Sequence, residues 1–217
     1  MGVAFLSIRI LLKCRAGFYE AAGLFTLGAA VDLLAYNVFS GLAARMVVGF
    51  SLIVAGYGVG ALLARMVESA RFIVPMCIVA ALADVWSVIA GPTRRIIESK
   101  SPFALQHAFV AYPTVSGEPD LQPVAGVTDL VFVALFMCLA SRLGLDMRRA
   151  ALGMFAGLAV GLATACIIGG APGIPFLAAG FIAANWKDLR PGRKEIVTTS
   201  LFVGVMLGIF AALSVLH

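Results

Sequence analysis

The stretch Ala125-Gly-Val-Thr-Asp129-Leu-Val-Phe132 opens a long apolar run and carries a carboxylate into it. A second carboxylate, Asp84, lies inside another apolar run, which ends just before the polar segment leading to residue 125. An ionisable side chain at membrane depth costs about 2.5–3.5 kcal/mol on insertion scales, so its presence indicates a function. We therefore interpret the rest of the chain as the scaffold that brings Asp84 and Asp129 together.

The composition is that of a protein that crosses a membrane several times. Of its 217 residues, 62% are hydrophobic and 12% are charged, and the mean hydropathy is +1.04. Soluble domains average about a quarter charged residues. The basic residues flank apolar runs and are not interleaved with aromatic residues, and the histidines and cysteines are scattered. We predict a lipid bilayer as surroundings, with no nucleic-acid partner, no metal and no cofactor.

The apolar runs predict an all-α fold, a polytopic transmembrane helix bundle of about seven spans that forms a single membrane domain over residues 1–217. Residues 1–15 are expected to lie on the membrane surface. Spans before the loop, within residues 1–91, are Phe18–Phe39, Met46–Leu63 and Phe72–Gly91, and an exposed loop follows over residues 92–124. The first and last spans after it, within residues 125–217, are Ala125–Leu143 and Ile196–Leu216. Between them, residues 150–186 have room for two short spans separated by a break at Gly169–Pro175.

Three local patterns predict further features of these segments. Glycines at Gly56–Gly60, and at 153, 157 and 161, allow neighbouring helices to approach closely. The segment His107–Val115 is rich in aromatic and β-branched residues, which fits either an extended strand that pairs with a peptide or a plain loop. Asp32, inside the first span, either forms a hydrogen bond with Tyr36 or Asn37 or joins the carboxylate site.

The distribution of lysine and arginine predicts the orientation of the chain in the membrane. Most of the 16 basic residues fall in the N-terminal segment and in the turns at residues 64–71, 142–149 and 187–195. The opposite side holds Arg45, Arg94, Arg95 and Lys100. We therefore expect a cytoplasmic N-terminus and an exoplasmic 92–124 loop, in the plasma membrane of a prokaryote.

Four features converge on one layer of the predicted bundle. Asp84 lies about two helical turns before Pro92, and Asp129 lies one to two turns after the loop, so both reach a similar depth from one membrane face. Asp32 falls near that depth, and the break at Pro172-Gly-Ile-Pro175 opens on the same face. Two facing carboxyl groups share a proton, so one can activate water while the other protonates a carbonyl.

This pattern resembles the presenilin and signal peptide peptidase family of intramembrane aspartyl proteases. The family carries Tyr-Asp in one span, Gly-x-Gly-Asp at the start of the next, and Pro-Ala-Leu at the start of a later one. Here Ala83-Asp84, Gly126-Val-Thr-Asp129 and Pro172-Gly-Ile-Pro175 stand in the same order, within about half of the chain.

The resemblance implies a presenilin-like catalytic core and cleavage of transmembrane segments or signal-peptide remnants. In that reading Asp84 and Asp129 are the catalytic pair, a transmembrane peptide is the substrate partner, and no metal takes part. The resemblance also implies that the 107–115 segment pairs with the substrate as a strand. The residues implied in substrate binding are Gly126, Pro172, Gly173, Ile174 and Pro175.

Two other functions fit the same residues. Paired intramembrane carboxyl groups and a broken helix are also features of proton-coupled transporters and channels. A catalytically inactive presenilin-like protein is the other alternative, because Ala83 and Thr128 stand where the family has tyrosine and glycine.

Overall fold

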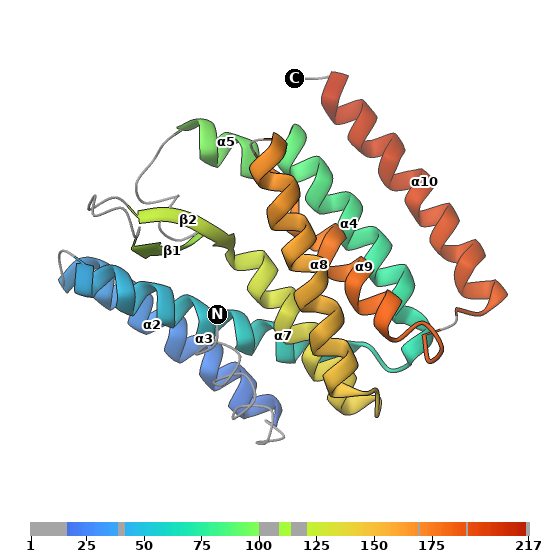
Figure 1. Ribbon diagram of the computed structural model, residues 1–217, viewed down its shortest axis with the longest axis horizontal. Coiled ribbons are helices and arrows are strands. Elements are labelled where there is room, and N and C mark those ends of the chain that lie inside the picture. Colours follow the sequence, from blue (N-terminus) through green and yellow to red (C-terminus); the bar gives the residue numbers. More distant parts are fainter. Residues whose placement is uncertain are drawn as a thin grey trace. The chain divides into compact units, whose positions relative to one another are not determined.

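The computed structural model describes residues 17–38, 42–99, 109–113, 121–168, 170–189 and 191–215, and they form a predominantly helical protein, as predicted (Figure 1). A helix occupies each of the seven predicted spans. These helices are α2 (Phe18–Val38), α3 (Leu42–Met66), α4 (Ile73–Ile89), α7 (Val127–Arg142), α8 (Met147–Ile168), α9 (Gly173–Ala184) and α10 (Arg193–Val215). The predicted surface helix at residues 1–15 lies outside the described residues.

Four helical segments of the described chain are long and apolar enough to cross a membrane. The predicted count of about seven spans is larger. The difference includes α7 and α9, whose 16 and 12 residues fall short of the roughly 20 that a span needs. The four candidate spans are Phe18–Ala35, Met46–Met66, Ala70–Ile96 and Met147–Ile168.

The predicted 92–124 loop contains more secondary structure than expected. Gly91-Pro92 ends α4 as predicted, and Pro92 then begins the short helix α5 (Pro92–Ser99), because proline suits the first position of a helix. Strand β1 (Phe109–Pro113) pairs antiparallel with β2 (Leu121–Gly126), which confirms an extended segment within 107–115. The fourth span therefore starts later than predicted, because Ala125 and Gly126 end β2 instead of beginning the helix.

The described elements form two compact units. The first contains α2, α3, the β1–β2 hairpin and α7, and the second contains α4, α5, α8, α9 and α10. In the first unit, α2 packs along α3, and β2 leads directly into α7 (Figure 1). In the second unit, α8 packs along α9, and α4 contacts both α9 and α10. The interpretation of residues 1–217 as one membrane domain stays a prediction.

The glycine stripe of α8 is the contact surface for α9, which confirms its predicted role in helix packing. A Cβ atom added at Gly153 would overlap the carbonyl oxygen of Gly180, and one added at Gly157 would overlap that of Phe176. At Gly161 the added atom would lie 3.2 Å from the ring of Phe176. The backbone of α8 therefore approaches α9 at positions where α8 has no room for a side chain.

The Gly56–Gly60 motif of α3 also allows close helix packing. A Cβ atom at Gly60 would lie 2.5 Å from the carbonyl oxygen of Val131 in α7. One at Gly58, within the same motif, would lie 2.7 Å from the carbonyl oxygen of Ala21 in α2. The motif thus faces two neighbours in the first unit, where the sequence pattern predicted one.

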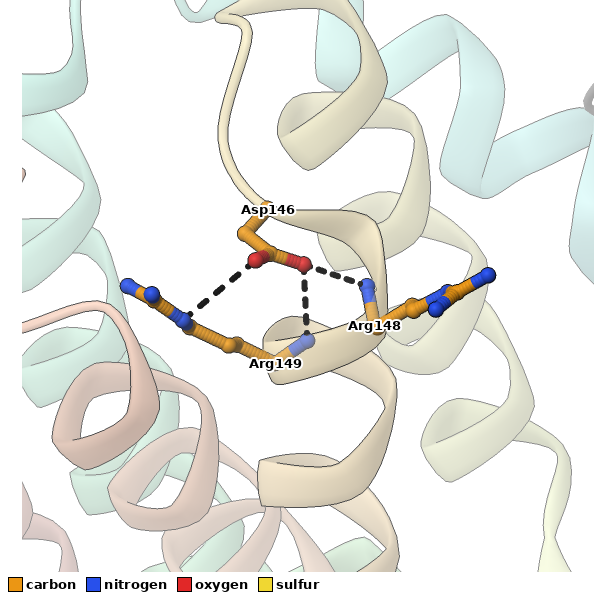
Figure 2. A network of polar contacts seen from close by, with 3 residues as sticks. All are labelled: Asp146, Arg148 and Arg149. Atoms are coloured by element: carbon orange, nitrogen blue, oxygen red, sulfur yellow. Dashed lines mark hydrogen bonds and ion pairs between the residues drawn. The ribbon is translucent and has the colours of Figure 1, made fainter.

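Asp146 caps the start of α8 through the polar contacts drawn in Figure 2. Its Oδ1 accepts the backbone N–H groups of Arg148 at 2.9 Å and of Arg149 at 3.1 Å, which are two of the donors that a helix start leaves unpaired. Its Oδ2 lies 3.3 Å from Nε of Arg149. The N–H of Arg149 contributes most to holding the pKa of the Asp146 carboxyl below its usual range.

The contact between α8 and α9 predicts the effect of a single added methyl group. Gly157→Ala forces the two backbones apart, so we expect the free energy of unfolding in detergent to fall by about 1–3 kcal/mol. Gly204→Ala in α10 is the control, because no atom lies within 4 Å of the added Cβ. Equal unfolding midpoints for the two variants contradict the packing described here.

The capping contacts of Asp146 predict a pH-dependent contribution to stability. Because the pKa of Asp146 is lower in the folded chain than in the unfolded chain, its carboxylate stabilises the fold above the unfolded pKa. That contribution disappears as the pH falls through the folded pKa. Asp146→Ala should therefore melt below the wild type at neutral pH, and the difference should narrow in acid. Asp146→Asn retains an oxygen acceptor and should lose less stability at neutral pH. A difference between wild type and Asp146→Ala that stays constant with pH refutes this assignment.

Candidate functional site

Asp84 forms a hydrogen bond with the start of α9. Its Oδ2 accepts the backbone N–H of Ile174 at 3.0 Å, which joins α4 to a residue 90 positions further along the chain. The sequence predicted that Asp84 and the Pro172–Pro175 break meet in one layer, and this contact confirms it. The carboxyl group is partly buried, five residues before the end of α4 at Ile89.

The sequence of α9 explains why a side chain from another helix binds at its start. Pro172 is the N-cap residue, with φ −64° and ψ 131°, and makes no side-chain cap hydrogen bond. Proline has no N–H, so the residues from Pro172 to Pro175 offer only the N–H groups of Gly173 and Ile174. Asp84 supplies the acceptor that Pro172 lacks, at the positive end of the helix dipole.

The connection between α8 and α9 is short because glycine permits an unusual backbone conformation. Gly170 has φ +150°, which residues with a Cβ atom rarely adopt. The chain then reaches Pro172 in an extended conformation before α9 begins. The break predicted from glycine and proline is therefore present, and it delivers the Ile174 N–H to Asp84.

Asp129 is the third residue of α7 and holds the helix start in place. Its Oδ2 accepts the backbone N–H of Gly126 at 3.2 Å, the geometry in which an acidic side chain in the first turn caps the residue before the helix. A Cβ atom at Gly126 would lie 3.4 Å from this oxygen and 3.3 Å from Oγ1 of Thr128. The Asp129 carboxyl group thus connects the last residue of β2 to the first turn of α7.

The predicted site residues fall into two groups. Asp84, Pro172, Gly173, Ile174 and Pro175 belong to the second unit, whereas Gly126 and Asp129 belong to the first. Within each group the structure shows a direct contact, from Asp84 to Ile174 and from Asp129 to Gly126. The pairing of the two carboxyl groups with each other stays a prediction.

Asp32 has a partner that the sequence interpretation missed. Its side chain is 7% exposed, and its Oδ1 lies 3.4 Å from Oγ of Ser51 on α3, whose hydroxyl is also 2.7 Å from the carbonyl oxygen of Val48. Of the two expected local partners, Asn37 donates to the carbonyl of Leu33 instead. A serine within an apolar stretch of the second predicted span was the available signal, because polar groups in such spans pair across helices.

Comparisons with protein-family models, curated proteins and solved structures found no match for this chain. The resemblance to the presenilin and signal peptide peptidase family therefore depends on the three blocks around Asp84, Asp129 and Pro172. Among the described residues, no group of three or more His, Cys, Asp or Glu side chains is placed to hold a metal ion.

The Asp84–Ile174 contact predicts a difference between two substitutions. Asp84→Ala leaves the N–H of Ile174 without its acceptor, so we expect a loss of about 1–3 kcal/mol in unfolding free energy and faster hydrogen exchange of that amide. Asp84→Asn retains an oxygen acceptor and should lose less. Indistinguishable stability and exchange for the two variants contradict a capping role for Asp84.

Proposed function

We propose that the chain is an intramembrane aspartyl protease in which Asp84 and Asp129 form the catalytic pair. The observation that supports this most directly is the hydrogen bond from Ile174 to Asp84. It ties one carboxyl group, inside a candidate membrane span, to the start of α9, which has Pro172 as its N-cap and Pro175 in its first turn. Carboxyl groups at membrane depth that are held by specific partners are typical of functional sites.

The proposed reaction is hydrolysis of a peptide bond without a covalent intermediate or a metal. The two carboxyl groups share one proton, because two like charges a few ångströms apart do not both ionise. The ionised carboxyl removes a proton from water, and the resulting hydroxide attacks the peptide carbon while the other carboxyl protonates the carbonyl oxygen. Collapse of the tetrahedral intermediate breaks the C–N bond. The leaving nitrogen takes up a proton from one carboxyl group, and a hydroxyl group of the intermediate returns a proton to the other, which restores the starting pair.

In this proposal, hydrogen bonds from the backbone hold each carboxyl group in a defined orientation. The N–H of Ile174 binds one oxygen of Asp84, and the N–H of Gly126 binds one oxygen of Asp129. In the proposed site, the second oxygen of the Asp84 carboxyl group faces water or substrate. The first turn of α9, from Pro172 to Pro175, would then lie beside the scissile bond and contribute to substrate binding.

The β1–β2 hairpin supports a route for presenting the substrate. A peptide bond inside a helix is protected, so the substrate must unwind before water attacks it. A two-stranded sheet has an outer edge on each strand, and an extended peptide can add to such an edge. Since β2 ends at Gly126, three residues before Asp129, a peptide paired with this hairpin would be led toward that carboxyl group.

The proposed enzyme is embedded in a membrane. Four apolar helices are compatible with a membrane protein. We propose a multi-pass protein of a prokaryotic plasma membrane, with a cytoplasmic N-terminus and the 92–124 segment outside. Its partners are then the bilayer and a transmembrane peptide substrate.

Cleavage of a labelled transmembrane peptide in liposomes tests the proposed reaction. We expect the wild type to cut the peptide, and Asp84→Asn and Asp129→Asn each to lower the rate by at least about 10²–10⁴-fold, because each removes one member of the acid–base pair. Asp146→Asn is the matched control, since it changes a carboxylate outside the candidate site and should retain full activity.

Retained cleavage in either Asp84→Asn or Asp129→Asn refutes the catalytic pair. Binding of the peptide without product, by folded wild type over a range of pH, points instead to an inactive relative. The buried Asp32–Ser51 contact favours a further candidate, a proton-coupled transporter, because it places a third carboxyl group inside a helix pair. Proton flux without cleavage in the same liposomes, lost in Asp32→Asn, would assign that function.

A further inference from the structure

The second unit contains an apolar groove between the N-terminal halves of α4 and α10. Its volume is about 590 Å³, within the range of pockets that hold small ligands. The α4 wall is formed by Phe72, Pro75, Met76, Val79 and Ala80. The α10 wall is formed by Lys194, Glu195, Thr198, Thr199 and Phe202. The groove is therefore lined by apolar groups, and its charged side chains both lie at the beginning of α10.

The length of the groove matches one leaflet of a bilayer. On each helix its lining covers eight residue steps, from Phe72 to Ala80 and from Lys194 to Phe202, or about 12 Å at the helical rise. Half of a bilayer's hydrocarbon core is about 15 Å thick. Deeper along the same helices, the rings of Trp86 and Phe210 stack with centroids 4.7 Å apart and so close the space between α4 and α10. A spanning helix would need a longer groove, whereas an acyl chain fits this one.

The charges around the open end favour an anionic occupant. The turn at residues 187–195 has four basic and two acidic side chains, and Arg71 stands immediately before Phe72. Lys194 is exposed where the groove begins. The acidic residue of the lining, Glu195, folds back on its own turn, because a Cβ atom at Gly192 would overlap its Oε2. The hydroxyl of Thr199 is hydrogen-bonded to the carbonyl of Glu195. Among the residues that line the groove, Lys194 carries the positive charge.

We propose that this groove binds an anionic glycerophospholipid, with an acyl chain between α4 and α10 and the phosphate beside Lys194. Basic pockets between membrane helices bind anionic lipid headgroups, and each lysine near the surface strengthens such binding about fivefold. The site uses none of the residues assigned to peptide hydrolysis. The proposed lipid binding is therefore independent of the proposed protease function.

Native mass spectrometry of the full-length protein in detergent tests this site with two lipids of identical acyl chains. Phosphatidylglycerol carries a net negative charge and phosphatidylcholine does not, so we expect about fivefold tighter binding of phosphatidylglycerol by the wild type. Lys194→Gln should reduce this ratio to near one. Lys187→Gln is the matched control, because Lys187 is exposed in the same basic turn but does not line the groove.

A second variant tests the acyl-chain part of the site. Thr198→Phe places a ring into the groove from an exposed position on α10 and should weaken binding of both lipids. Glycerol phosphate, which has the charge but no acyl chain, should not displace bound phosphatidylglycerol. The proposal is overturned if Lys194→Gln keeps the wild-type ratio, if Thr198→Phe binds both lipids as the wild type does, or if glycerol phosphate competes.

Discussion

A carboxyl group inside an apolar helix needs a hydrogen-bond donor, and in α4 the donor for Asp84 comes from the start of another helix. Transmembrane helices satisfy their own backbone groups along their length, so free N–H groups occur only at helix ends or breaks. Pro172 and Pro175 reduce the donors at the start of α9 to two, and one of these binds Asp84. This hydrogen bond joins the start of α9 to α4 within the second unit.

Close backbone contact holds α9 in that position. The glycine stripe of α8 lets it approach α9 until backbone meets backbone at Gly153 and Gly180, and again at Gly157 and Phe176. Helices in lipid gain little from burying apolar side chains, so such packing and specific hydrogen bonds carry the association. The α8–α9 contact and the Asp84–Ile174 contact therefore act together, since the first fixes the axis of α9 and the second fixes its starting end.

Asp129 shows how one residue can serve both structure and proposed chemistry. As the third residue of α7, it caps the N–H of Gly126 and so marks the point where strand β2 becomes a helix. An acidic residue at this position is explained by helix capping alone. The block Gly126-Val-Thr-Asp129 therefore marks the start of α7. Its proposed catalytic role requires the Asp129 carboxyl group to act on water or substrate in addition to capping the helix.

The sequence by itself determined the apolar helical class, most of the places where helices start and stop, and the glycine faces, because composition, proline and glycine act locally. It also determined that Asp84 and the Pro172–Pro175 break converge, since helix depth follows from counting residues. Only the tertiary structure decided that Ser51 is the neighbour of Asp32, that Gly58 and Gly60 face different helices, and that β2 continues through Gly126. Those features depend on rotation and register between elements distant in the chain, which no local pattern encodes.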